Sequence, residues 1–153
     1  MKVRGYTDAD WEDVKEIYNL SKVDELKGSV DLRAFIPLER DPRNLRLFRE
    51  SRIVVVEESE TILGFGGNSG AYISWLFVHP RHRRRGVARM ILHHILDRLE
   101  GTATLNVFKN NRAARALYRQ FGFEIEREFT GTLNGFRTEA MTLRRDKPVH
   151  TKK

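Results

Sequence analysis

The sequence predicts a mixed α+β domain, in which a mostly antiparallel, twisted sheet carries helices on both faces. Short apolar stretches at residues 53–56, 62–66 and 71–78 are separated only by turn residues, which indicates an antiparallel meander. From Gly86 the apolar residues adopt helical spacing, and a further strand is predicted at 103–107. The order strand, helix, strand predicts that 71–78 and 103–107 pair in parallel through a right-handed crossover.

The N-terminal part is predicted to open with a strand at residues 2–6 and a helix. Thr7 and Asp10 have the spacing of a capping box at the start of that helix. Its apolar residues recur at intervals of three and four, at Trp11, Val14, Ile17 and Tyr18.

The region that follows is predicted to hold only short helical pieces, at residues 32–35 and 45–48. Pro37 and Pro42 prevent one continuous helix through it, because proline lacks the amide hydrogen that a helix interior requires. We expect a variable loop on the substrate side of the domain here.

The C-terminal third is predicted to contain a helix and a hairpin. A helix opens at Asn111 and is closed by Gly122. Residues 123–129 and 136–143 flank Asn134-Gly135, a pair that tolerates the positive φ angles of a tight hairpin turn. These strands bring the expected total to six or seven.

Composition limits the chemistry that the chain can perform. With 153 residues and 40% hydrophobic content, we expect one domain at residues 1–146 and a basic, disordered tail at 147–153. The absence of cysteine excludes a thiolate nucleophile, a disulfide framework and a cysteine metal site. No stretch has the length and apolarity of a membrane span or a secretory signal, so a cytoplasmic protein without a membrane partner is expected.

The charge of the chain points to a polyanionic partner. The net charge is +7, and arginines concentrate at residues 81–89. Such a cluster suits either a nucleic acid or a phosphate-rich cofactor, and charge alone does not choose between them.

The strongest functional signal lies where an apolar strand ends in a basic, glycine-containing loop that leads directly into a helix. The first amides of a helix have no intrahelical acceptor and lie at the positive end of its dipole, which favours an anion there. Gly86 and Ala88 are small enough to let a pyrophosphate approach the backbone. The competing interpretation is a solvated arginine run at the start of an ordinary helix.

A second motif lies downstream, where Asn111, Ala114, Tyr118, Gly122 and Phe123 occur at fixed spacing. This segment resembles the N-x-x-A-x-x-x-Y-x-x-x-G-F pattern of the GCN5-related N-acetyltransferase (GNAT) superfamily, and the preceding loop resembles that family's R/Q-x-x-G-x-G/A signature. The resemblance is specific in order and spacing over residues 73–129. It implies a GNAT-like fold that is splayed between the fourth and fifth strands.

The resemblance also implies a co-substrate, acetyl-CoA, whose pyrophosphate is held by loop amides and whose pantetheine arm lies along the strand at 71–78. On this basis the expected cofactor-binding residues are Leu76, Phe77, Val78, Arg83, Arg84, Arg85, Gly86, Val87, Ala88, Arg89, Asn111 and Arg115. The other interpretation of Asn111 is a helix N-cap, a role that it could fill at the same time. No metal is expected, because His93 and His94 are adjacent and point about 100° apart on a helix.

Tyr118 is the expected catalytic acid. When an amine attacks a thioester, the leaving sulfur gains charge, and a phenol with an ordinary pKa near ~10 can give it a proton or a hydrogen bond. The alternative is a core aromatic. No general base can be assigned, since the strand at 71–78 has no acid where many relatives carry a glutamate. Glu39 and Asp41 are weak candidates, and His79, His82, His93 and His94 are interpreted as structural or solvated.

The predicted activity is therefore transfer of an acetyl group to a primary amine of a small molecule or protein, by direct attack in a ternary complex. The acceptor itself is not predicted. A basic nucleic-acid-binding module is the alternative, although it leaves the Asn111–Phe123 pattern unexplained. Assembly into a homodimer is expected by analogy only.

Overall fold

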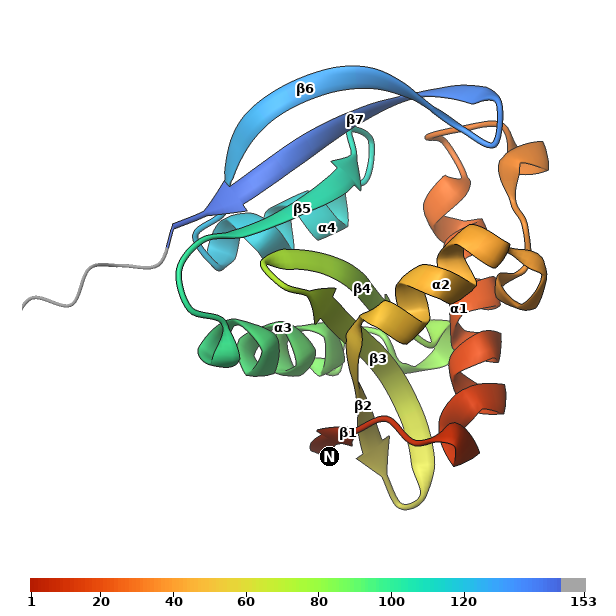
Figure 1. Ribbon diagram of the computed structural model, residues 1–153, viewed down its shortest axis with the longest axis vertical. Coiled ribbons are helices and arrows are strands. Elements are labelled where there is room, and N and C mark those ends of the chain that lie inside the picture. Colours follow the sequence, from red (N-terminus) through yellow and green to blue (C-terminus); the bar gives the residue numbers. More distant parts are fainter. Residues whose placement is uncertain (147–153) are drawn as a thin grey trace, which may run out of the picture.

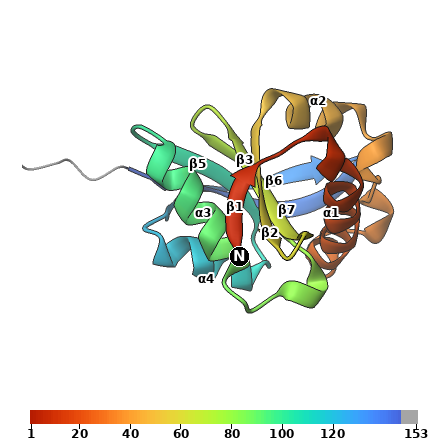
Figure 2. The same cartoon turned by 90° about the horizontal axis from the view of Figure 1, so that it is seen from below.

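The computed structural model describes residues 1–146 and contains one seven-stranded sheet with helices on both faces (Figures 1 and 2). The expected tail at 147–153 lies outside the described residues. The strands are β1 (Lys2–Gly5), β2 (Arg52–Glu58), β3 (Thr61–Ser69), β4 (Tyr72–Val78), β5 (Ala103–Phe108), β6 (Glu124–Leu133) and β7 (Phe136–Arg145). The helices are α1 (Trp11–Leu26), α2 (Pro42–Glu50), α3 (Val87–Arg98) and α4 (Arg112–Gln120).

The strands lie in the order β1-β2-β3-β4-β5-β7-β6. Neighbours are antiparallel except β4 and β5, which run parallel and share a single register pair, Tyr72 with Thr104. Thr104 donates its amide to the carbonyl of Ala71 over 2.9 Å. The two strands therefore meet at one end and diverge along the rest, which confirms the predicted fold class and its splay.

The sheet separates two hydrophobic cores. Alternate residues of β2 point to opposite faces, as the period of a strand requires. Val54 and Val56 join the core beneath α3 and α4, whereas Ile53 and Val55 join the core beneath α1 and α2. Figure 2 shows α3 and α4 on one side of the sheet and α1 and α2 on the other.

Glycines on β3 bring α3 close to the sheet. A Cβ atom built on Gly64 would lie 2.9 Å from Cγ1 of Val87, and one on Gly66 would lie 2.4 Å from Cγ2 of Ile91. Both distances are shorter than real Cβ contacts, so side chains at these positions would push the helix outward. The first two turns of α3 are thus fixed against β3.

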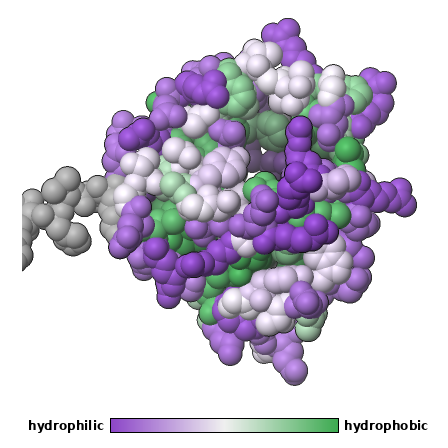
Figure 3. All heavy atoms as spheres, viewed as in Figure 1, coloured by the Kyte–Doolittle hydropathy of each residue, from purple (hydrophilic) through white to green (hydrophobic). Residues whose placement is uncertain are grey.

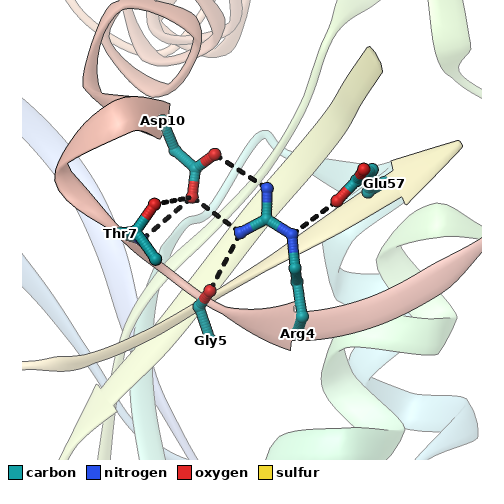
Figure 4. A network of polar contacts seen from close by, with 5 residues as sticks. All are labelled: Arg4, Gly5, Thr7, Asp10 and Glu57. Carbon is teal, nitrogen blue, oxygen red and sulfur yellow. Dashed lines mark hydrogen bonds and ion pairs between the residues drawn. The ribbon is translucent and has the colours of Figure 1, made fainter. Parts of the chain in front are cut away.

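A polar network joins β1 to the start of α1 (Figure 4). Both terminal nitrogens of Arg4 donate to the carboxylate of Asp10, each over 2.9 Å, and Nε of Arg4 donates to Glu57 on β2. The amide of Thr7 also donates to Asp10 over 2.9 Å, which confirms the predicted capping box. The box caps the N-terminus of a 3-10 helix, Asp8–Asp10, which leads directly into α1.

The predicted turns and breaks are confirmed. Asn134 and Gly135 have φ angles of 50° and 88° and join β6 to β7. Pro42 is the first residue of α2, a position that proline tolerates because its missing amide hydrogen has no intrahelical acceptor there. The short helical piece predicted at 32–35 is a 3-10 helix, Leu32–Ala34.

Candidate functional site

The loop after β4 turns sharply into α3. Arg84 and Gly86 have φ angles of 63° and 81°, the left-handed conformation that glycine adopts most readily. Gly86 precedes the helix, and its carbonyl accepts the amide of Met90 over 3.0 Å. The amides of Val87, Ala88 and Arg89 lie before this first helical hydrogen bond, so they form the donor-rich end of a twelve-residue helix.

The arginines of this loop have partners within the protein. Arg83 pairs with Asp24 of α1 over 3.1 Å. Arg85 pairs with Glu58 of β2 over 2.6 Å. These pairs brace the loop from two sides, and both are half-exposed, so either guanidinium can exchange its carboxylate for another anion.

Two further arginines of the predicted site lie on helices. The guanidinium of Arg89 lies 5.8 Å from the ring centre of Phe121, and Arg115 donates to the carbonyl of Lys109 over 2.8 Å. Together with the loop, they place positive charge beside the N-terminus of α3 and along α4.

A cleft of about 340 Å³ occupies the gap between β4 and β5. Figure 3 shows a hollow between the β6–β7 hairpin and α2, with hydrophobic residues beside it. The cleft brings together several predicted site residues, which are Leu76, Phe77, Asn111 and Tyr118.

The backbone of β4 offers polar groups to this gap. The amide of His79 bonds to the carbonyl of Leu63 over 2.9 Å, so at this end of β4 the odd-numbered residues bond to β3. The backbone groups of Leu76 and Val78 therefore point away from β3. The carbonyl of Val78 accepts the hydroxyl of Ser21 over 2.7 Å. Leu76 thus faces a gap that an extended ligand can fill by strand-like pairing.

Tyr118 lies on α4 with 8% of its surface exposed, and its ring packs edge-to-face against Phe123 at 5.7 Å. Its hydroxyl has no hydrogen-bond partner within residues 1–146. Every fully buried side-chain polar atom in that range has a partner, so the Tyr118 hydroxyl is not fully buried. The hydroxyl must therefore reach the cleft. Burial raises the pKa of the Tyr118 phenol well above its usual value, with smaller contributions from Glu25 and Tyr72. The phenol keeps its proton throughout the neutral range.

Asn111 caps α4. Its side-chain oxygen accepts the amide of Ala114 over 3.2 Å, and the residue also lines the cleft. Asn111 therefore acts as the helix N-cap that the sequence suggested. Its side-chain NH₂ group is not used by this bond and is available for a ligand.

The cleft is bordered on its far side by the segment after α1. Asn110 donates to the carbonyl of Gly28 over 2.8 Å, and Thr138 donates to Ser29 over 2.9 Å. Asn134, at the tip of the β6–β7 hairpin, donates to Ala34 over 2.6 Å. Figure 1 shows this hairpin tip beside the segment between α1 and α2. We name residues 28–34 the bordering segment.

The acids that reach the cleft differ from the expectation. Asp41 lines it, but its two carboxylate oxygens accept the backbone and side-chain nitrogens of Asn44 over 3.2 and 3.0 Å. Glu39 accepts the side chain of Asn19 and lines a different pocket. Glu25, which sequence reasoning missed, lines the cleft directly.

The signal for Glu25 was present but not specific. Tyr18, Lys22 and Glu25 stand four and three residues apart, so they share one face of α1, and all three line the cleft. Tyr18 belongs to the predicted apolar face of the helix, but nothing in the sequence says that Lys22 and Glu25 also point inward. Tyr18 is buried, which raises the pKa of its phenol, and it accepts the side-chain amide of Asn44 over 3.2 Å.

His79, His82, His93 and His94 do not line the cleft. Nδ1 of His79 accepts the amide of Arg81 over 3.1 Å, and burial lowers the pKa of His79 and of His94. Within residues 1–146, no three acids or histidines converge where they could hold a metal ion. In the same range, no helix has the length and apolarity to span a membrane.

Comparison with known proteins identifies relatives of parts of the chain. This chain is 40% identical over 80 residues to human cysteine-rich protein 2-binding protein, and the match covers 48% of this chain and 10% of that protein. It is 34% identical over 99 residues to the ribosomal protein bS18-alanine N-acetyltransferase of Salmonella typhimurium, covering 60% of this chain and 64% of that enzyme. The chain thus spans less than two thirds of either relative.

Solved structures match over nearly the whole chain. The structure of a GCN5-related N-acetyltransferase from Rhodopseudomonas palustris superimposes with a TM-score of 0.82 at 17% identity, covering 95% of each chain. That of yncA from Salmonella typhimurium, solved with its cofactor acetyl-CoA, has a TM-score of 0.74 at 19% identity, covering 100% of this chain and 97% of that one. At these identities the likeness concerns the fold. The family model for acetyltransferases matches residues 11–123, which include the loop, the cleft strands and Tyr118, and the chain therefore belongs to the acetyltransferase (GNAT) family.

Proposed function

We propose that this protein is an acetyl-CoA-dependent N-acetyltransferase that moves the acetyl group to a primary amine by direct attack in a ternary complex. The proposal depends on one arrangement around the gap between β4 and β5. The donor-rich end of α3 lies beside the end of β4, and the Tyr118 hydroxyl lies within the gap. Family membership and the acetyl-CoA bound to yncA support it.

The residues of the loop and of β4 fit such a co-substrate. The amides from Gly86 to Arg89 would bind the pyrophosphate, with Arg83, Arg84 and Arg85 supplying positive charge. The backbone of Leu76 would pair with the pantetheine arm, while Phe77 and Asn111 line its path. The backbone of Phe77 bonds to β3, and the carbonyl of Val78 bonds to Ser21, so these two groups contribute less than the sequence suggested.

Tyr118 is the acid in this proposal. When bound, acetyl-CoA supplies an acyl thioester as the electrophile. The Tyr118 hydroxyl stays protonated because burial raises its pKa, and it faces the cleft without a partner in residues 1–146. It can therefore donate its hydrogen to the leaving sulfur as charge develops there.

The acceptor is proposed as a class only. Relatives acetylate an alanine of a ribosomal protein or peptidyl lysine, so peptide amines are the first to test, with small-molecule amines beside them. Neither the family match nor the structure supports the nucleic-acid alternative. The cytoplasm as compartment and a homodimer as assembly remain proposals, the latter to be checked by light scattering.

The experiment measures free thiol released from acetyl-CoA over a panel of peptides and small amines, and thermal stabilisation by CoA. A ligand at one hundred times its Kd stabilises by about 2.7 kcal/mol, a readily visible shift. Tyr118→Phe should lower kcat by about a hundredfold while keeping the stabilisation by CoA. Tyr6→Phe, in another pocket, serves as the control. An unchanged kcat in Tyr118→Phe would remove Tyr118 from the mechanism.

A further inference from the structure

We infer that Glu25 is the catalytic base of this acetyl transfer, taking the proton of the acceptor amine from the α1 side of the cleft. This inference rests on the proposed function, since it concerns the same reaction. A base is required because an amine carries no free lone pair while it is an ammonium.

The position of Glu25 distinguishes it from the other acids of the chain. In residues 1–146, the carboxylates that line the cleft are those of Glu25 and Asp41. Asp41 is occupied as the cap of α2, since both of its oxygens accept nitrogens of Asn44. Glu25 receives a hydrogen bond from one side chain, Lys22, over 3.0 Å, and that bond leaves lone pairs for a substrate.

The pair of Lys22 and Glu25 is unlike the other ion pairs of α1. Their side chains are 18% and 24% exposed, whereas Lys15 and Glu12, at the same spacing on the same helix, are 26% and 78% exposed. Nζ of Lys22 also lies 5.2 Å from the ring centre of Phe108 and 5.9 Å from that of Phe77. These rings belong to the two diverging strands, so Lys22 anchors Glu25 at the gap between them.

Glu25 and Tyr118 approach the cleft from different elements, α1 and α4. Burial is the main cause of the raised pKa of Tyr118 and of Tyr18, and the negative charge of Glu25 adds to it at both phenols. An amine between Glu25 and Tyr118 would therefore have a proton acceptor and a proton donor within one cavity. This arrangement separates the two proton transfers of the reaction.

The transfer balances with these two groups. The ammonium of the acceptor gives one proton to the Glu25 carboxylate, and the freed nitrogen lone pair forms a bond to the carbonyl carbon of the acyl thioester. The carbon–sulfur bond breaks, and the sulfur takes the hydroxyl proton of Tyr118. The second nitrogen proton leaves to solvent as the amide forms, and solvent returns a proton to the phenol and removes one from Glu25.

The experiment compares Glu25→Gln with the wild-type protein on two amines of similar size. Ethylamine is almost entirely an ammonium at neutral pH, whereas trifluoroethylamine is mostly neutral, because its fluorines withdraw electrons. Glu25→Gln should lower kcat/KM for ethylamine by about a hundredfold or more, and for trifluoroethylamine by far less. Equal losses for both amines would contradict the inference, because a base matters most to the amine that needs one.

A binding measurement gives a second readout without turnover. Calorimetry of protein saturated with CoA should show alaninamide, a cationic probe, binding about tenfold more weakly to Glu25→Gln than to the wild type, since a charge-assisted hydrogen bond is lost. Unchanged binding together with unchanged rates would overturn the inference.

Glu12→Gln is the matched control. It removes one carboxylate from the same helix and breaks the same type of ion pair, but Glu12 does not line the cleft. Rates and binding should match the wild type, and both variants should bind CoA normally. If the wild-type protein releases no thiol with any amine, the proposed function fails; if it is active and Glu25→Gln matches it, only the role of Glu25 fails.

Discussion

Gly66 of β3 lies directly beneath Ile91 of α3, so close that a Cβ on Gly66 would come within 2.4 Å of the Ile91 Cγ2 atom. The N-terminus of α3 faces the expected phosphate site, and the position of this helix is fixed by its contact with β3. Its position depends on the absence of a side chain on β3.

Gly66→Ala should therefore destabilise the protein by about 1–3 kcal/mol, the usual cost of overpacking a core. Chemical denaturation measures the free energy of unfolding. Gly5→Ala is the control, because no atom lies within 4 Å of a Cβ at Gly5. A cost at Gly5 as large as that at Gly66 would show that backbone effects, not contact with Ile91, dominate.

The turn between β2 and β3 offers a stabilising change. Ser59 and Glu60 have φ angles of 49° and 65°, a conformation that costs a side-chain-bearing residue roughly 1 kcal/mol. Glu60→Gly should therefore stabilise the protein by about that amount, seen as a higher midpoint of thermal unfolding. Gly135→Ala, at φ 88° in the other hairpin, should lower the midpoint to a similar extent. A lower midpoint for Glu60→Gly would mean that the Glu60 side chain has a stabilising role.

Acid should weaken the tie between β1 and α1. Hydrogen bonds from Arg4 hold the pKa of Asp10 below its usual value, so the carboxylate contributes stability above its unfolded pKa. That contribution is lost as the pH falls below about 4 and through the lowered pKa of the folded state. Asp10→Asn should be less stable than the wild type by about 1–3 kcal/mol at neutral pH, and the difference should shrink in acid. Urea unfolding across this range measures it, and a constant difference would refute the linkage.

The contribution of Gly86 to CoA binding can be measured separately from its contribution to stability. A Cβ at Gly86 would meet no protein atom within 4 Å, but its φ of 81° makes Gly86→Ala cost about 1 kcal/mol in stability. If its backbone lies against the pyrophosphate, CoA affinity should also fall more than about tenfold by calorimetry. Gly101→Ala, with φ 83° and equally open space, should show the first effect alone. Equal CoA affinity in both variants would place the ligand elsewhere.

Much of the fold could be predicted from local signals. Pro80 and Gly86 mark where β4 ends and α3 begins, and Asn134-Gly135 marks the last hairpin. Each signal acts through backbone conformation at its own position, so no tertiary information is required. The parallel pairing of β4 and β5 follows from the helix that connects them, because parallel strands are usually joined by such a crossover.

The unpredicted parts depend on contacts between distant residues. The pairing of Arg83 with Asp24 and of Arg85 with Glu58 could not be inferred from an arginine run. Glu25 was missed for the same reason, because a polar helix face is normally solvated, and only the divergence of β4 from β5 turns it into a wall of a cleft. The glycines of β3 were visible in the sequence, but their role required the position of α3.

The hydrogen bonds that fasten residues 28–34 to Asn110, Asn134 and Thr138 have a consequence for how such a protein can diversify. They join the bordering segment to the β6–β7 hairpin and to the turn before α4, and none of these belongs to the loop before α3. Insertions or exchanges there would change this border of the cleft, while the loop before α3, where we propose that the phosphates bind, would keep its sequence.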